Sequence, residues 1–337
     1  MRKGRHAGSS PSRSSALAVG PVRSRVDAPD NVQRVKPNNS IVALGGGRGL
    51  DSVLSALRGT DIGLTVIVSI ADDGERGGDR QQRLTGAGVD ELRRSLEALS
   101  GEGALLRAIR RPLTVEQLGR HRLGNLALAS AAAAFGDYSR ASIWLGEQLG
   151  IDGAVLPATI EPTRHETEVV DRGSMFKPAR GRRRRVRKLR FAGEPPRSPD
   201  AAIAAIEEAA WVLLAPGALY RSVLPTAAVP DLRAALMRTS ARVVWIANLE
   251  PDPLDASNLT AIEHLLVLRM HGVRVDAVLH DESATLKFDP AELAGNGAES
   301  MSRALCSRTD PALHEPEQLR MALSPMLSLR PASAVGS

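Results

Sequence analysis

The chain has 337 residues, 43% of them hydrophobic but only 3% aromatic, which predicts one large or two modest domains with an aliphatic core. The single cysteine, Cys306, excludes an internal disulfide or a metal site built from several cysteines, and it fits a reduced, cytoplasmic setting. Residues 1–40 hold eight Lys and Arg against two Asp and Glu, so they carry the whole net charge of +6, and the rest of the sequence is not a basic nucleic-acid-binding domain.

Residues 1–38 are rich in Ser, Arg, Pro and Gly and have little apolar periodicity. We expect a disordered basic leader there, and the lack of a sustained apolar segment argues against a secretory signal. Elsewhere the sequence has no apolar run long enough to span a membrane, so no membrane partner is expected.

Folded sequence begins near Ser40 with a β-rich apolar run, 41–44, which ends in four glycines within five residues. From residue 50 the apolar side chains follow helical spacing, which predicts a strand, a tight turn and a helix. Glycine lets a ligand approach the backbone, and a helix N-terminus offers unpaired N–H groups and a partial positive charge. The turn is therefore either a plain connection or a phosphate site. The candidate residues of that site are Gly45, Gly46, Gly47, Gly49 and Leu50.

A buried parallel strand is predicted at 64–70, and Asp72 and Asp73 follow it. Carboxylates at this end of a strand can hold a sugar or ribose hydroxyl, a base edge or a hydrated metal ion, and the same residues also suit an Asp-Gly turn. Further on, Asn125 stands at the entry to an Ala-rich helix, where it either caps the helix or presents its amide to a ligand.

Residues 160–195 form a polar excursion with a dense basic run from Arg180 to Arg190. Such a run could bind RNA or acidic lipid. No aromatic residues interleave with the arginines, which favours a solvated hairpin or small insert. Nucleic acid is therefore not the expected partner.

A second strand–turn–helix junction follows the apolar strand 211–215. Its Pro-Gly turn brings backbone N–H groups close to an arginine, which can bond a phosphate through two parallel hydrogen bonds. The candidates at this junction are Pro216, Gly217, Tyr220, Arg221 and Ser222. The next buried strand, 242–248, ends in Asn248, a further candidate for sugar, ribose, base or metal.

Strands and helices alternate along most of the chain, which predicts an α/β fold with a doubly wound, mostly parallel, Rossmann-like sheet and helices on both faces. The ends of such strands lie on one edge, so the two junctions and the polar strand ends are expected to meet in one crevice. We divide the chain into the leader at 1–38, an α/β domain at 39–285 and a helical or irregular extension at 286–337.

Seven short motifs follow one another in the chain. They are 42–50 (VALGGGRGL), 71–74 (ADDG), 124–126 (GNL), 155–157 (VLP), 216–222 (PGALYRS), 248–249 (NL) and 263–264 (EH). In this order and spacing they resemble the YvcK/CofD-like family over roughly residues 40–282. That family includes gluconeogenesis factors and 2-phospho-L-lactate transferases, and the opening glycine loop is closer to the YvcK branch.

For the YvcK branch the resemblance implies a Rossmann-like fold that binds UDP-sugars such as UDP-N-acetylglucosamine, with roles in carbon metabolism, cell-wall precursor control and cell shape. We therefore expect a nucleotide-sugar-binding homo-oligomer rather than a catalyst. The transferase branch would imply instead the transfer of a phospholactyl-type group to a deazaflavin, with Mg²⁺. A third alternative is a regulator that binds nucleic acid or a protein partner through the basic segments.

The chain departs from the family pattern in several loops. After residue 74 the family's Gly-Ser-Ser-Gly is replaced by ERGGD at 75–79, and GVDE at 88–91 stands in place of Pro-Pro-Gly-Asp. Ala218 and Arg221 replace a usual Ser and Thr, and a Gly-Glu-Thr is missing after Asn248. Extra acids near a phosphate weaken anion binding by Coulomb repulsion unless a metal bridges them.

Overall fold

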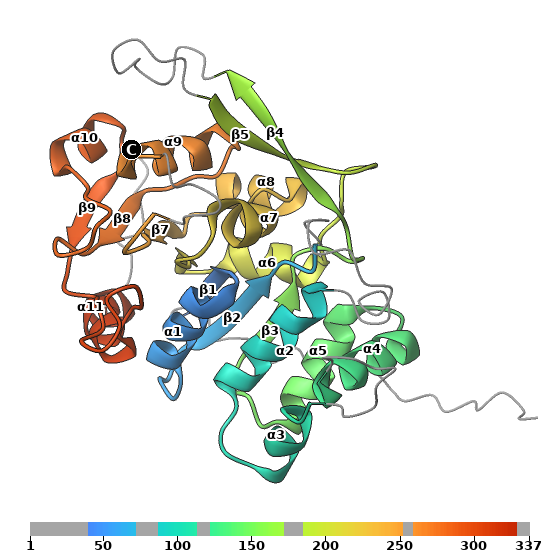
Figure 1. Ribbon diagram of the computed structural model, residues 1–337. Helices are drawn as coiled ribbons and strands as arrows, with labels where there is room; N and C mark the ends of the chain where they lie inside the picture. The colour runs from blue at the N-terminus through green and yellow to red at the C-terminus, as the bar shows by residue number, and fades with distance from the viewer. Residues whose placement is uncertain (1–39, 72–86, 113–121, 172–184, 252–258, 329–337) are drawn as a thin grey trace, which may run out of the picture. The chain divides into compact units, whose positions relative to one another are not determined.

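The computed structural model describes residues 40–71, 87–112, 122–171, 185–251 and 259–328. These residues form a seven-stranded sheet in the spatial order β3-β2-β1-β6-β7-β8-β9, in which every neighbouring pair is parallel (Figure 1). The strands are β1 (Ser40–Gly45), β2 (Gly63–Val68), β3 (Ala154–Pro157), β6 (Trp211–Leu214), β7 (Arg242–Ile246), β8 (Ala277–His280) and β9 (Glu299–Ser302). The predicted α/β, doubly wound, parallel fold is confirmed.

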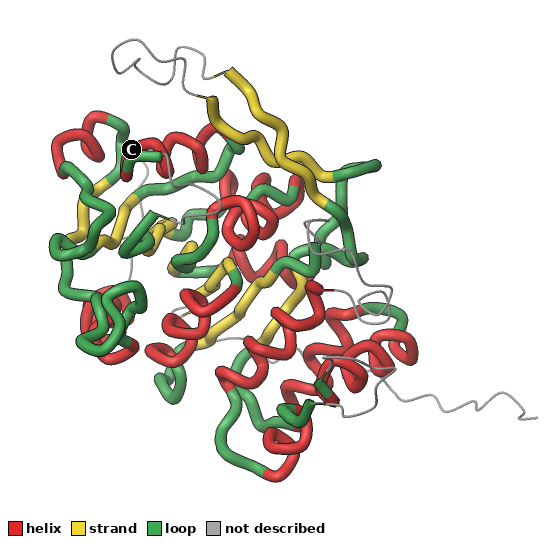
Figure 2. Tube along the Cα trace, viewed as in Figure 1, coloured by secondary structure: helices red, strands yellow, loops and turns green. Residues whose placement is uncertain are grey.

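Helices cover both faces of this sheet (Figure 2). Successive side chains of a strand point to opposite faces, so Ile41 and Ala43 of β1 belong to one buried cluster, and Val42 and Leu44 belong to the other. The first cluster packs α1 (Gly47–Leu57), α2 (Ala87–Leu99), α4 (Leu123–Phe135), α5 (Tyr138–Gln148) and α11 (Pro316–Ser328). The second packs α6 (Asp200–Glu208), the π-helix η3 (Leu219–Val223), α7 (Leu224–Ala227), α8 (Pro230–Arg238), α9 (Ala261–Met270) and α10 (Pro290–Gly295). A short helix, α3 (Ala104–Ile109), packs on α4.

The direction of winding reverses at β1. From β1 the chain adds β2 and then β3 on one side, and it returns to place β6 on the other side. Leu44 pairs with Leu214 in the register of β1 and β6, so the two strands end level with each other. This reversal is a topological switch point, where the loops that leave neighbouring strands run apart and open a crevice.

The polar excursion contains an antiparallel hairpin of β4 (His165–Asp171) and β5 (Arg185–Phe191), separate from the main sheet. Two side chains of the core attach β5: the Tyr220 hydroxyl donates to the Arg187 carbonyl at 2.8 Å, and the Leu189 N–H donates to His271 Nε2 at 2.9 Å. Arg190 forms an ion pair with Glu168 at 3.1 Å. The beginning of the basic run, 180–184, lies outside the described residues.

The residues beyond 285 contribute to both the sheet and its cover. β9 pairs with β8 at the edge of the sheet, and α11 packs against α1. In the described part of the chain, no helix is both long and apolar enough to cross a bilayer. The leader, 1–38, lies outside the described residues.

Candidate functional site

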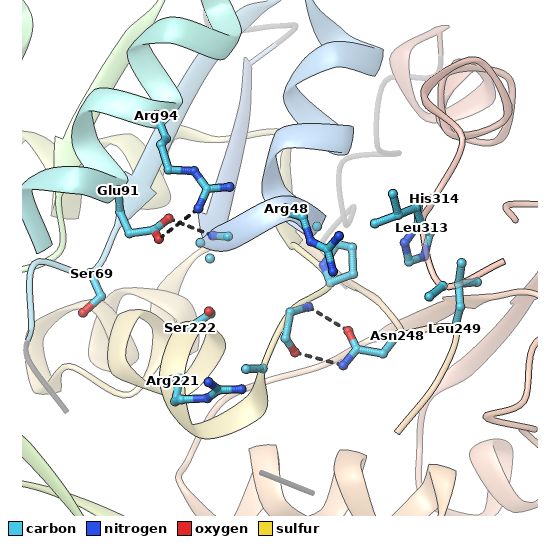
Figure 3. Close-up of a pocket in the computed structure, with 18 of the residues that line it drawn as sticks. Arg48, Ser69, Glu91, Arg94, Arg221, Ser222, Asn248, Leu249, Leu313 and His314 are labelled. Atoms are coloured by element: carbon cyan, nitrogen blue, oxygen red, sulfur yellow. Dashed lines mark hydrogen bonds and ion pairs between the residues drawn. The ribbon is translucent and has the colours of Figure 1, made fainter. Parts of the chain in front are cut away.

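A cavity of about 610 Å³ lies at the carboxyl ends of the strands, where the switch point predicts a crevice (Figure 3). Its lining comes from the turn between β1 and α1, the turn between β6 and η3, the residues after β7 and the first turns of α2. Segments 45–49 and 216–218 face each other there, and segment 312–314 closes a further wall. The cavity thus gathers pieces of the chain that are more than 250 residues apart in sequence.

The first junction presents the N-terminus of α1 to the cavity. Gly47 has φ 71°, in the left-handed region that glycine adopts without strain. Its N–H donates to Glu91 Oε2 of α2 at 2.7 Å. The N-cap residue of α1 is Gly46, which has no side chain to cap the helix, and the first turn of α1 contains no acidic residue. The carboxylate of Glu91 therefore supplies the negative charge that a helix N-terminus favours.

The two junctions touch at Gly49. A Cβ atom placed on Gly49 would lie 2.0 Å from the carbonyl oxygen of Pro216 and 2.6 Å from its carbonyl carbon. Real Cβ atoms do not approach other atoms so closely, so only glycine lets the two turns meet. This contact sets the distance between the start of α1 and the start of η3.

Asn248 holds the second junction in place. Its Oδ1 accepts from the Gly217 N–H at 2.7 Å, and its Nδ2 donates to the Gly217 carbonyl at 3.0 Å. The oxygen and the nitrogen of the Asn248 amide both form hydrogen bonds with Gly217. These bonds attach the segment after β7 to the turn that follows β6. Arg221 and Ser222 extend from that turn into the lining of the cavity (Figure 3).

Charged groups of both signs line the cavity. Among the described lining residues, the cations are Arg48, Arg94 and Arg221, and the anions are Glu91 and Glu250. Burial by itself lowers the pKa of Arg94, but the hydrogen bond and charge of Asp51 raise it above its ordinary value. That bond is 2.5 Å long, and Glu91 Oε1 lies 3.8 Å from Arg94 Nη1.

His314 anchors the wall that comes from the C-terminal segment. Its Nε2–H donates to the carbonyl of Ala247 at 3.1 Å, directly before Asn248. Burial lowers the pKa of His314 to about 4, so the imidazole is neutral at pH 7. Residues 305 and 306, of which Cys306 pairs with His314 in an antiparallel bridge, are tied to the end of β8 by Asp281. Asp281 Oδ2 accepts from the backbone N–H groups of Leu305 at 2.5 Å and Cys306 at 2.9 Å. Burial by itself raises the pKa of Asp281, but the hydrogen bonds from the hydroxyl and N–H of Ser283, together with those from Leu305 and Cys306, lower it far below its ordinary value.

Most of the candidate residues from the sequence lie together around this cavity. Those that line it are Gly45, Gly46, Gly47, Gly49, Pro216, Gly217, Arg221, Ser222 and Asn248. Asp72 and Asp73 lie outside the described residues, so their roles stay predictions. No local sequence pattern marks the lining residues Ser69, Arg94, His165 and segment 312–314. The sequence indicates Arg48 only as part of the glycine loop and Glu91 only as part of an altered motif.

Three candidates are placed elsewhere by their own elements. Leu50 is 1% exposed and packs in the core below α1. Tyr220 is likewise 1% exposed and directs its hydroxyl to the hairpin. The Asn125 amide accepts from Arg93 Nε at 2.8 Å and donates to Asp90 at 2.9 Å, so it joins α4 to α2.

Among the described residues, which leave out Asp72 and Asp73, no three His, Cys, Asp or Glu side chains are grouped closely enough to hold a metal ion. Of the described residues that line the cavity, the carboxylates are Glu91 and Glu250. Among the described residues the lining therefore does not form a complete protein site for Mg²⁺.

Three comparisons with known proteins agree with this architecture. The family model described as 2-phospho-L-lactate transferase CofD matches residues 41–304. A relative from Deinococcus radiodurans, described as "Putative gluconeogenesis factor", is 30% identical over 310 residues, which cover 84% of this chain and 65% of the relative. A relative with the same description from Mycobacterium tuberculosis is 35% identical over 247 residues, 69% of this chain and 72% of the relative. This chain thus spans less than two thirds of the length of the D. radiodurans relative.

A solved structure supports the fold independently. The crystal structure of a member of the UPF0052 family from Bacillus halodurans has a TM-score of 0.72 and covers 85% of this chain and 99% of its own. The two chains are 24% identical, so this likeness concerns the fold alone. The family model spans residues 41–304, and relatives described as gluconeogenesis factors are 30–35% identical to this chain. The chain belongs to the YvcK/CofD-like family.

Proposed function

We propose that this chain binds a nucleotide sugar of the UDP-N-acetylglucosamine type in the cavity at the switch point. The observation that carries the proposal is the meeting of two strand–turn–helix junctions, after β1 and after β6, around one cavity of about 610 Å³. Ligand sites typically measure ~300–1,000 Å³ and prefer this position in α/β sheets. The cavity therefore has both the size and the place of a nucleotide site.

The diphosphate would lie between the two junctions. The N-terminus of α1 offers the Gly47 N–H and a partial positive charge, which favour an anion. Arg221 and Ser222 face the same cavity from the opposite turn, and Arg48 adds a second guanidinium. Guanidinium groups bind phosphate through charge-assisted hydrogen bonds, so these residues match a ligand with two adjacent phosphates.

The nucleoside and the sugar would extend to opposite ends of the cavity. Leu249 and Leu313 lie on the side away from Glu91 and Ser69, which gives one end an apolar surface suited to a base (Figure 3). At the other end we propose that Asp72 and Asp73 contact the sugar or ribose hydroxyls. Asn248 already uses its amide on Gly217, so its proposed role is to hold the phosphate-binding turn.

A role in carbon metabolism, cell-wall precursor control and cell shape completes the proposal. The relatives described as gluconeogenesis factors support only its first part, the role in carbon metabolism. In this role the chain senses a nucleotide sugar and does not consume it. We therefore expect binding without turnover.

Isothermal titration of the full chain with UDP-N-acetylglucosamine tests the proposed ligand. We expect saturable binding, a rise in Tm with ligand concentration, and a loss of at least tenfold in affinity for Arg221→Ala. The matched control is Arg238→Ala, which removes an exposed guanidinium from α8, outside the cavity lining. A folded protein that shows neither heat nor a Tm shift at millimolar ligand would exclude this ligand class.

The description of the family model, a 2-phospho-L-lactate transferase, favours one alternative. In this alternative the chain would move a phospholactyl-type group onto a deazaflavin, with Mg²⁺. Incubation with a nucleotide-activated phospholactate, a deazaflavin and Mg²⁺ would then form a phosphodiester to the deazaflavin hydroxyl, break the phosphoanhydride of the donor and release a nucleoside monophosphate, and both products would be detected by mass spectrometry. Product formation that depends on Arg221 would establish the transferase in place of the sensor.

A further inference from the structure

Glu91 lies at the N-terminus of α1, which is the phosphate position of the function proposed above. Its Oε2 accepts the Gly47 N–H at 2.7 Å and lies 3.2 Å from the place where a Gly46 side chain would begin. The residue belongs to α2, 44 positions further along the chain, and its carboxylate lies over the glycine turn. An anionic oxygen on the first N–H of α1 uses the same hydrogen bond and the same helix charge that a phosphate would use.

The carboxylate is not locked in this position. Glu91 keeps 29% of its side chain exposed, and the cavity borders it. Arg94, on the next turn of α2, lies beside this carboxylate, with its Nη1 3.8 Å from Glu91 Oε1 (Figure 3). A rotation of the Glu91 side chain can therefore give up the Gly47 N–H and shorten the existing ion pair with Arg94, which also bonds Asp51.

We propose, on the basis of the function proposed above, that Glu91 is an internal competitor for the phosphate site. In the free protein its carboxylate satisfies the N-terminus of α1. A phosphate of the ligand takes over the Gly47 N–H, and Glu91 turns to Arg94. The competition lowers the affinity for every anion, and a diphosphate that also engages Arg221 displaces Glu91 better than a single phosphate does.

The test measures Kd by isothermal titration in EDTA for the full-length wild-type chain, Glu91→Gln, Glu91→Ala and a control, Asp90→Asn. Asp90 is the neighbouring carboxylate on the same turn of α2, but it bonds Arg93 and Asn125 instead of the glycine turn. The probes are inorganic pyrophosphate, UDP-N-acetylglucosamine and the uncharged nucleoside uridine. Circular dichroism and Tm establish that each variant is folded.

We expect both Glu91 variants to bind pyrophosphate about tenfold more tightly than the wild type, because the competing charge is gone. Asp90→Asn should stay within about twofold, and uridine should show no gain. Unchanged or weaker pyrophosphate binding in the Glu91 variants would overturn the proposal, since Glu91 would then support the ligand. An equal gain in Asp90→Asn would also overturn it, because a general field effect would explain the result.

The pyrophosphate and nucleotide-sugar arms separate the two proposals. If pyrophosphate responds as expected but UDP-N-acetylglucosamine binds no variant, the internal competitor stands and the proposed ligand fails. If UDP-N-acetylglucosamine binds the wild type but removal of Glu91 brings no gain for either anion, the ligand stands and the competitor fails. Absence of all binding to folded protein overturns both.

Discussion

The contact between Gly49 and Pro216 gives the most direct test of how the site is built. In Gly49→Ala, the new methyl group would lie 2.0 Å from a backbone oxygen and 2.6 Å from a backbone carbon. Ordinary van der Waals contact begins at 3.4 Å, so the two turns must separate by about 1.4 Å at this point. No side-chain rotation relieves the clash, because both opposing atoms belong to the backbone.

Two opposing effects set the size of the change. Alanine is better than glycine in a helix by about 1 kcal/mol, which favours the variant. Overpacking of a close contact costs about 1–3 kcal/mol and sometimes more, which disfavours it. Because the clash is at the severe end, we expect a net loss of about 2 kcal/mol of unfolding free energy. The separated turns also move the Gly47 N–H away from Arg221, so affinity for a diphosphate falls as well.

Urea unfolding followed by circular dichroism measures the loss. With a slope of about 2–3 kcal/mol per molar urea, the midpoint should fall by somewhat less than 1 M. Gly295→Ala is the matched control, since Gly295 also lies in a helix and a Cβ there meets no atom within 4 Å. The control should be neutral or slightly stabilised. Equal midpoints for the two variants would refute the idea that close approach of the turns requires glycine at 49.

Three further outcomes follow from the site. Asn248→Asp should lower the unfolding free energy, measured in urea, by about 1–3 kcal/mol. The reason is that a carboxylate accepts from the Gly217 N–H but repels the Gly217 carbonyl. An unfolding free energy equal to that of the wild type would show that the amide does not hold the turn. In titrations, Arg221→Lys should weaken pyrophosphate binding less than Arg221→Ala does, because lysine keeps the positive charge but lacks the planar guanidinium. Equal losses of affinity in the two variants would show that the charge of Arg221 does not contribute to binding. The pKa of His314 is about 4 in the folded chain, below its ordinary value of 6.5, because the imidazole is buried. Burial of the neutral imidazole therefore costs no unfolding free energy above pH 6.5, and the unfolding free energy falls by about 3 kcal/mol as the pH drops to 4. His314→Gln should remove that part of the pH dependence in urea unfolding at pH 7.5 and 4.5, and an unchanged pH profile would contradict the assignment.

The fold could be predicted from local patterns because each pattern has a short-range cause. The β-rich run 41–44 and the helical spacing that begins at residue 50 depend on periodicity alone, and both elements form where that periodicity places them. Alternation of strands and helices then allows few arrangements other than a parallel, doubly wound sheet. The meeting of the two junctions follows from the same rule, since all strand ends share one edge.

The side chains of the site were predicted less well because their directions depend on packing. Leu50 belongs to the helical stripe that faces the core, so its place next to the glycine turn says nothing about a ligand. Tyr220 lies on the buried side of η3, where the hairpin accepts its hydroxyl. Glu91 and segment 312–314 reach the cavity only through the packing of distant elements. No pattern of neighbouring residues encodes such contacts.

The glycines of the first junction serve two different purposes, which the sequence alone does not separate. Gly49 is required by its contact with Pro216 whether or not a ligand binds. At Gly47 a Cβ atom would meet only the hydroxyl of Ser222, 3.9 Å away, among the described residues, so packing does not demand glycine there. Its φ of 71° instead presents an N–H to an anion, at present the carboxylate of Glu91. Glycine at 49 is therefore explained by close packing of two turns, whereas glycine at 47 is explained by a left-handed backbone that directs its N–H to Glu91.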